Sequence, residues 1–172
     1  MEIALKGTTD MRKRLMLLGI TSQSQMRIRH FNPVLVTNID KIIRRFYEHI
    51  LSFPEAASLL TKVDIKGRLI PAQREHWLQL FKCEFSDEFV NRALRIGRIH
   101  YTNRIPPYLY MGGYNYFLCA VLEMAAQHVR GLDLPELLAD ITRLVTLDMD
   151  LSISAYLREH WRDGEGDAVA AP

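Results

Sequence analysis

Helical periodicity limits the folds open to this chain more than any other feature of its sequence. Apolar residues recur at spacings of three and four along most of the 172 residues, and alternating runs of strand type are missing. Turn signals are few and lie between the periodic stretches. They occur at Pro33, at Ser52–Pro54, at Ser86-Asp87, at Pro106-Pro107, and at Gly131 with Pro135. The pattern predicts an all-α fold.

The turn signals divide the chain into about seven or eight helical segments. These are expected near Asp10–Leu18, Ser24–Pro33, Thr37–Leu51, Glu55–Leu60, Ile65–Glu84, Asp87–Thr102, Tyr108–Arg130 and Pro135–Trp161. Thr37 and Asp40 have a capping-box spacing in the broad sense. Pro71 interrupts its segment, so regular helix either begins near Ile70 or is kinked there. The tail DGEGDAVAAP is small and polar, which predicts a linker or frayed end at 163–172 after one domain at 1–162.

The last helical segment is apolar on more than one face. A helix on the surface of a monomer needs only one apolar stripe, but Leu134–Leu157 has apolar residues on two faces. Two interpretations are equally open at this point. Either a second subunit covers one face, or the helix lies in the centre of the core of a single chain.

Composition and motifs exclude several classes of function. The 22 basic and 20 acidic residues nearly balance, which gives no reason to expect nucleic acid as a partner. Two cysteines without a framework, no membrane-spanning run and no signal peptide predict a cytoplasmic protein. The six histidines form no HxH or HExxH pair, and GxSxG, P-loop and GxGxxG motifs are missing. We therefore expect no zinc site of the usual kinds and no enzymatic activity in this domain.

The segment Asp87–Thr102 places a histidine on an apolar stripe. On a helical projection Phe89, Ala93, Gly97 and His100 fall on one face, with arginines on the other. A buried imidazole needs a partner for each ring nitrogen. Taken alone, the pattern favours a core histidine with ordinary hydrogen bonds, and a metal ligand is the other interpretation.

Two further residues on apolar stripes could carry chemistry. Tyr47 sits at the edge of the stripe in Thr37–Leu51, where its hydroxyl could reach a pocket or meet water. His76 is a rival metal ligand on the stripe of the Ile65–Glu84 segment. For each of them, taken alone, the pattern favours ordinary packing at the boundary of the core.

Three sequence blocks in order resemble the globin-coupled sensor family. The strongest covers residues 95–117 and reads RIGRIHYTNRIPPYLYMGGYNYF, with an Ile-His pair, then prolines, then Leu-Tyr-Met-Gly opening the next helix. The others are FYEHILSFPE at 46–55 and FSDEFVNR at 85–92. The resemblance runs from about Asp10 to Trp161. It implies a globin-like helical sandwich with an extra N-terminal helix, holding haem b.

The resemblance also implies roles for single residues. His100 would be the proximal ligand of the haem iron, and the Tyr47 hydroxyl would stabilise bound dioxygen. Small residues on the stripe of His100 would let the flat cofactor approach closely. The expected cofactor-binding residues are His100, Tyr47, Phe46, Leu69, Ala72, Phe89, Ala93, Gly97 and Tyr110. The chain departs from the family at Leu109, where tryptophan is frequent, and at Ala72, where some members have a polar residue.

The function implied is that of a gas sensor. Ferrous haem would bind O2, or CO or NO, and a homodimer formed by the two C-terminal helices would signal to an output domain outside this chain. Outputs in the family include diguanylate cyclases, histidine kinases and chemotaxis transducers. Two alternatives remain open. One is a single-domain globin for O2 storage or NO detoxification, and the other is a cofactor-free helical interaction module.

Overall fold

The computed structural model describes residues 7–169 apart from 62 and 132, and side chains from 11 to 158 with the same gaps. In this part of the chain every regular element is a helix, which confirms the predicted all-α class. The elements are α1 (Gly7–Leu18), α2 (Ser22–Leu51), α3 (Pro54–Leu60), the π-helical turn η1 (Ile65–Leu69), α4 (Ile70–Leu80), α5 (Asp87–Thr102), α6 (Pro107–His128) and α7 (Leu134–Val169).

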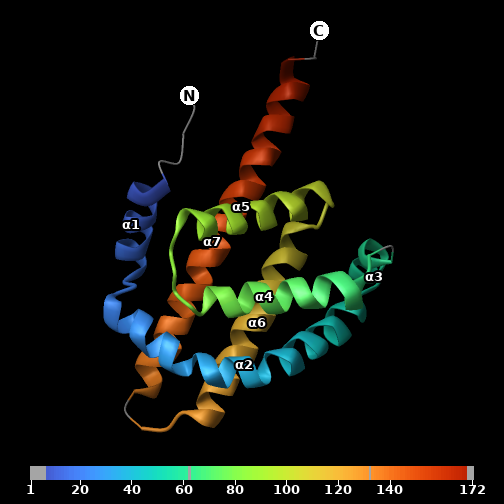
Figure 1. Ribbon diagram of the computed structural model, residues 1–172. Helices are drawn as coiled ribbons and strands as arrows, with labels where there is room; N and C mark the ends of the chain where they lie inside the picture. Colours follow the sequence, from blue (N-terminus) through green and yellow to red (C-terminus); the bar gives the residue numbers. More distant parts are fainter. Residues whose placement is uncertain (1–6, 62, 132, 170–172) are drawn as a thin grey trace.

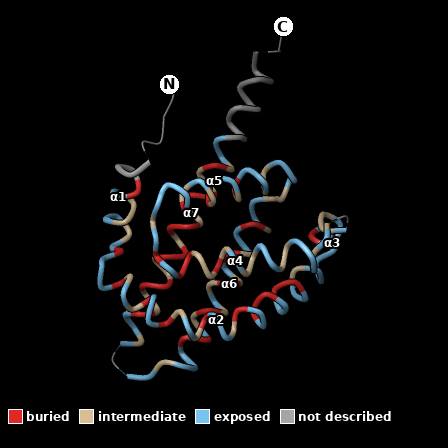
Figure 2. The backbone as a smooth tube through the Cα atoms, in the orientation of Figure 1, coloured by how far each residue is buried: buried red, intermediate tan, exposed pale blue. Residues whose placement is uncertain are grey.

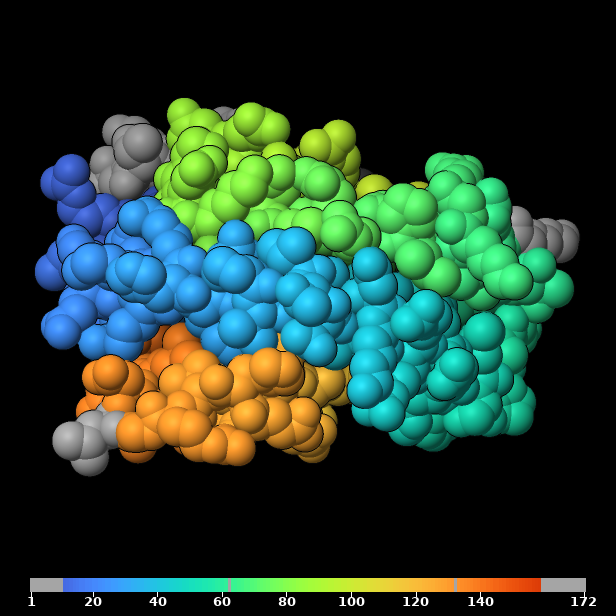
Figure 3. All heavy atoms as spheres, turned by 60° about the horizontal axis from the view of Figure 1, so that its bottom comes forward, coloured from blue at the N-terminus to red at the C-terminus, as the bar shows by residue number. Residues whose placement is uncertain are grey.

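The helices form two crossing layers around one core. Figure 1 shows α4 and α5 running across α6 and α7, with α2 closing the lower side. Figure 3 shows α2 along the whole of one face, with the green residues of α4 and α5 on one side of it and the orange residues of α6 on the other. Buried residues follow the inner side of α2 and recur along α7 between Leu137 and Ala155, whereas the outer sides of the helices are exposed (Figure 2).

Helix α7 lies at the centre of this packing. It packs most extensively against α5, and it also contacts α6, α2 and α1. Its apolar residues are therefore buried on several sides by helices of the same chain, as the central-helix interpretation of the sequence requires. The buried apolar side chains are Leu137, Ile141, Leu144, Val145, Leu147, Leu151 and Ala155. The backbone stays helical to Val169, beyond the point where a linker was predicted, and 170–172 lie outside the described residues.

Helix α2 differs from the sequence prediction, because it passes through Pro33 without a break. A proline inside a helix costs about 3 kcal/mol or more through a lost hydrogen bond and a clash. Ile28, Leu35 and Ile39 are fully buried along the same side of the helix, and each contributes about 1.5–3 kcal/mol. That burial outweighs the cost of the proline. The helix starts at a capping box made by Thr21 and Ser24, close to the predicted start at Ser24, and Thr37 lies inside it instead of opening a second helix.

The two helices that approach the candidate site begin as their sequences indicate. Helix α4 begins at Ile70, with Pro71 in its first turn, which confirms the first of the two predicted possibilities. The π-helical turn η1 precedes it, and π-type turns are frequent at functional sites. Helix α5 has the predicted bounds, and the Ser86 hydroxyl accepts a hydrogen bond from the backbone of Phe89 at 3.3 Å.

Candidate cofactor site

A cavity of about 490 Å³ lies between the helices, on the side where α2 and α5 end. Helices α2, α3 and α4 supply one wall, and α5 and α6 supply the other. The volume is in the range of about 300–1,000 Å³ that is usual for ligand sites. Most of the lining is apolar: Phe46, Ile50, Ala56, Leu59, Leu60, Leu69, Ala72, Trp77, Ile96, Ile99, Leu109 and Phe117.

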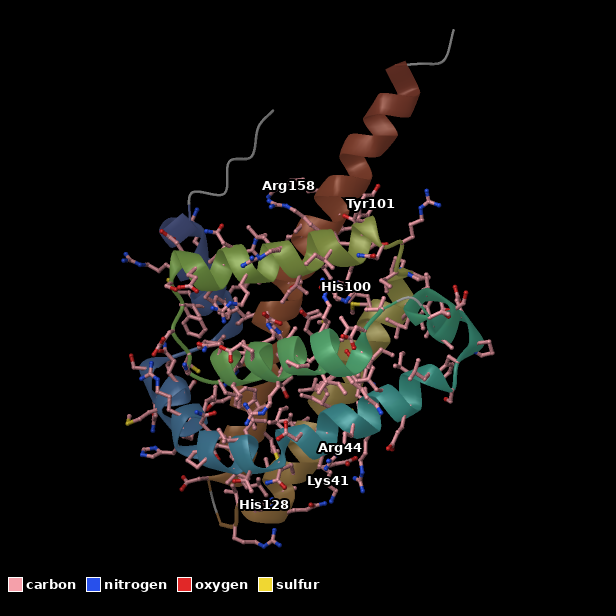
Figure 4. The ribbon with its side chains drawn as sticks, turned by 45° about the vertical axis from the view of Figure 1, so that its right-hand side comes forward. Lys41, Arg44, His100, Tyr101, His128 and Arg158 are labelled. Carbon is pink, nitrogen blue, oxygen red and sulfur yellow. The ribbon has the colours of Figure 1, made fainter. Side chains whose placement is uncertain are left out.

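His100 lines this cavity from the last turns of α5 (Figure 4). Its Nδ1–H donates a hydrogen bond to the carbonyl of Ile96 at 2.8 Å. Burial lowers the pKa of His100 below its ordinary value, so the ring is neutral at pH 7. With the proton held on Nδ1, the unshared pair lies on Nε2, which forms no hydrogen bond with another described residue. A histidine in this state is a metal ligand of the usual protein type.

Tyr110 fixes the plane of the His100 ring. Their ring centroids lie 4.1 Å apart at an interplanar angle of 22°, which is a stacked arrangement. Tyr110 comes from the first turn of α6, just after the Pro106-Pro107 junction. Its side chain is buried, and burial raises the pKa of Tyr110 to about 12. The predicted proximity of Tyr110 and His100 is present in the structure.

Tyr47 lines the same cavity from the other wall. It lies near the end of α2 with only 7% of its surface exposed, and burial raises its pKa to about 12. The hydroxyl is thus protonated at physiological pH, and it makes no hydrogen bond with another described residue. The ring meets Phe46 edge to face at 5.2 Å, and Phe46 in turn packs against Phe117 at 4.8 Å. This packing presents a neutral hydrogen-bond donor to the cavity.

Some residues of the lining come from a turn or a helix end and are exposed on their outer side. Leu69 and Ala72 line the wall beside Tyr47, as predicted. Arg68, in the π-helical turn, contributes a guanidinium, and Asn103 caps the end of α5. An apolar slot with a guanidinium and an amide at its margin suits a flat apolar molecule that has acidic groups on one edge.

Three of the predicted cofactor-binding residues do not line this cavity. Phe89, Ala93 and Gly97 are buried or nearly so on α5, but they lie outside the cavity lining. Gly97 faces α7 so closely that an added Cβ would lie 1.9 Å from the carbonyl oxygen of Ser152. The small residues of α5 thus serve helix packing rather than the approach of a cofactor. A helical projection identifies an apolar face but does not say which neighbour covers it.

His76, the rival ligand, lines the cavity but has a partner. Its Nε2 lies 2.9 Å from Oδ2 of Asp148, a fully buried carboxylate on α7. Burial alone lowers the pKa of His76, but the nearby Asp148 charge and their hydrogen bond outweigh it, and the pKa is raised. The Tyr114 hydroxyl donates to the same oxygen at 2.9 Å. Asp148 favours the protonated form of His76, which has no unshared pair to offer a metal, so the neutral His100 is the better ligand candidate of the two histidines that line the cavity.

Sequence reasoning missed several members of the site. It did not assign Leu59 and Leu60 of α3, or Trp77 and Phe117, which stack at 4.7 Å. It also missed Asp148, although a carboxylate inside the apolar pattern of the last helix is a signal of a buried polar contact. Short apolar helices such as α3 have no pattern that indicates which cavity they will line.

The residues present fit haem better than a bare metal ion. No group of three or more metal-ligating side chains occurs in the described residues, so protein atoms there could not complete the coordination of a free ion. A single imidazole suffices when the other ligands belong to an organic ring, as in haem. The apolar walls and the polar margin suit the two faces and the propionate edge of such a ring.

No helix in the part of the chain that the structure describes could span a membrane.

One relative is similar to this chain along most of the chain's length. The chain is 25% identical over 155 residues to the "Heme-based aerotactic transducer HemAT" of Halobacterium salinarum. This match covers 84% of the chain but only 32% of the relative, so the chain spans about a third of that protein's length.

The fold has a counterpart among solved structures. The globin domain of a Geobacter sulfurreducens globin-coupled sensor superposes with a TM-score of 0.80 at 15% identity, covering 85% of this chain and 97% of that one. This likeness confirms the predicted globin-like fold. The Protoglobin family model matches residues 8–162. The chain therefore belongs to the protoglobin family.

Proposed function

We propose that this domain binds haem b in the cavity and senses a diatomic gas, with O2 as the first candidate and CO and NO as others. The observation that carries the proposal is the state of His100. Its imidazole is neutral, its Nδ1–H is bonded to a backbone carbonyl, and its Nε2 is available in an apolar cavity of suitable size. Family membership supports the same function.

Four polar residues of the cavity have distinct roles in this proposal. His100 holds the iron from one wall, and the stacked Tyr110 fixes the orientation of the imidazole. When bound, haem supplies a ferrous iron with an open coordination position, at which a gas binds reversibly. From the opposite wall Tyr47 donates a hydrogen bond toward a ligand that carries partial negative charge. Arg68 attracts the propionate edge.

A hemin titration tests the proposal. We expect the purified chain to bind hemin with a stoichiometry of about one, with an intense absorption band near the violet edge of the visible spectrum. Reduction followed by exposure to CO, NO or O2 should shift that band reversibly. A chain that stays colourless and gives no saturable titration would instead be the cofactor-free interaction module.

Signalling in this proposal passes through a homodimer of α6 and α7. Support comes from Met111 on α6 and Leu157 on α7, which are large apolar side chains with 42% and 47% of their surfaces exposed. Sedimentation velocity on the full chain tests this step. A dimer that Leu157→Glu dissociates is the expected result. A wild-type chain that stays monomeric would favour a globin that binds its gas without a helical output.

A further inference from the structure

One turn of α7 collects contacts from both walls of the cavity. Asp148 and Ser152 are four residues apart and fully buried. His76 of α4 and Tyr114 of α6 both line the cavity, and both hydrogen-bond Oδ2 of Asp148 at 2.9 Å. Asp148 itself does not line the cavity. It is thus connected to the cavity only through the side chains of its wall.

The same turn also holds α5, the helix that carries His100. The Ser152 hydroxyl donates to the carbonyl of Ala93 at 3.1 Å, and the Tyr114 hydroxyl lies 3.1 Å from Ser152 Oγ. The Ser152 carbonyl is in close contact with Gly97, three residues before His100. His76 on the cavity wall and α5, which carries His100, therefore both contact one turn of the central helix α7.

The energetics make this junction sensitive to its surroundings. A buried carboxylate without partners costs several kcal/mol, and the hydrogen bonds of Asp148 all go to Oδ2. Its Oδ1 accepts none from the described part of the chain. If the cavity wall moves, Asp148 must follow His76 and Tyr114 or lose what stabilises its charge. Because Gly97 of α5 packs against the backbone of Ser152, α5 also cannot move without moving α7.

We infer that the Asp148–Ser152 turn couples occupancy of the cavity to α7, with Asp148 as a positioning residue. A movement of His76 on the cavity wall then reaches α7 through Asp148. A movement of α5, which carries His100, reaches α7 through Ser152. This coupling rests on the proposed function only where the occupant is haem, because any molecule that shifts His76 or Tyr114 would engage it.

Amide hydrogen exchange of the full chain with and without hemin tests the coupling. In the wild type, bound hemin should slow the exchange of the α7 amides at 149–158 by a factor of about five or more. A factor of about five is the lower end of the coupling usually found between two sites. Asp148→Asn keeps the shape of the side chain but removes its charge. It should retain the hemin band and reduce the difference in α7 exchange to less than about twofold.

A matched control separates coupling from general loss of stability. Asp140 is also fully buried on α7 and is held by Arg27 at 2.7 Å, but neither residue lines the cavity. Asp140→Asn should preserve the hemin-dependent change. Ser152→Ala is a milder second variant, in case Asp148→Asn does not fold, and it should also reduce the change.

The outcomes distinguish this inference from the proposed function. Unchanged coupling in both Asp148→Asn and Ser152→Ala, or equal loss in Asp140→Asn, would overturn the inference while hemin binding stands. Failure to bind hemin would end the proposed function instead. The same variants would then be compared by amide chemical shifts under xenon, which enters apolar cavities. Shifts in α7 that depend on Asp148 would support the coupling, and shifts that do not would refute it.

Discussion

Gly97 and Ser152 are in backbone contact where α5 crosses α7. A Cβ at position 97 would lie 1.9 Å from the Ser152 carbonyl oxygen and 3.1 Å from the Cβ of Ala155. The carbonyl oxygen of Ser152 belongs to the backbone, so it cannot rotate away as the end of a side chain could. The helix that carries His100 is thus held at a separation from the central helix that only glycine permits.

Gly97→Ala should therefore destabilise the fold. Overpacking in a close-packed region typically costs about 1–3 kcal/mol, which exceeds the gain of about 1 kcal/mol from replacing glycine by alanine in a helix. Urea unfolding followed by circular dichroism measures the change. Gly112→Ala on α6 is the control, because nothing lies within 4 Å of its added Cβ, and it should be neutral or stabilising. Equal effects of the two substitutions would contradict the close contact.

His100→Ala should weaken hemin binding by about 100-fold or more, equivalent to about 2.7 kcal/mol, because it removes the iron ligand. Competition with apomyoglobin for hemin measures this loss. His128→Ala is a matched control. His128 also donates from Nδ1 to the carbonyl four residues before it, at 2.9 Å, but it does not line the cavity. If His100→Ala binds hemin as tightly as the wild type does, another residue must be the iron ligand.

Tyr47→Phe should speed O2 release from the hemin-loaded ferrous protein by about tenfold to a hundredfold, while CO release changes much less. The hydroxyl is a neutral donor, since burial raises its pKa to about 12, and CO carries less negative charge than O2 when bound. Stopped-flow measurements with both gases check this. Tyr116→Phe, in the same aromatic cluster but outside the cavity lining, should leave both rates unchanged.

The His76–Asp148 pair predicts a pH dependence of stability. Burial lowers the pKa of His76, but the charge of Asp148 and its hydrogen bond together outweigh this effect. The pKa of His76 is therefore raised above 6.5. A group with a raised pKa in the folded state contributes its full stabilisation below the unfolded value, and loses it as pH rises through the folded value. The difference in unfolding free energy between wild type and His76→Gln should therefore shrink as pH rises above 6.5. Urea unfolding without hemin measures it. A difference that stays constant with pH would show that the pair is not charged.

Local signals in the sequence predicted the helices well where caps and turns are explicit. Asp87–Thr102 was predicted with the observed bounds, because Ser86 and the prolines at 106 and 107 mark its surroundings. The break at Pro33 was wrong, because the burial that carries α2 through the proline is a tertiary effect.

The site was predictable in part. The family resemblance predicted one cofactor site for Tyr47, His100 and Tyr110, and the three residues line one cavity in the structure. Gly97 was misplaced because a projection cannot distinguish the face toward a cofactor from the face toward α7. Asp148 was missed because its partners lie more than 30 residues away in the sequence, as the separations to His76 and Tyr114 show.

The parts of α2 before and after Pro33 make different contacts. The first half is anchored, because Arg27 grips the buried Asp140 of α7. The second half ends in the residues that hold Phe46 and Tyr47 at the cavity. Since proline leaves the helix one hydrogen bond short at this point, bending there is cheaper than elsewhere along it. If α2 bends, we therefore expect the bend at Pro33, so that the end lining the cavity moves while the end held by Arg27 stays in place.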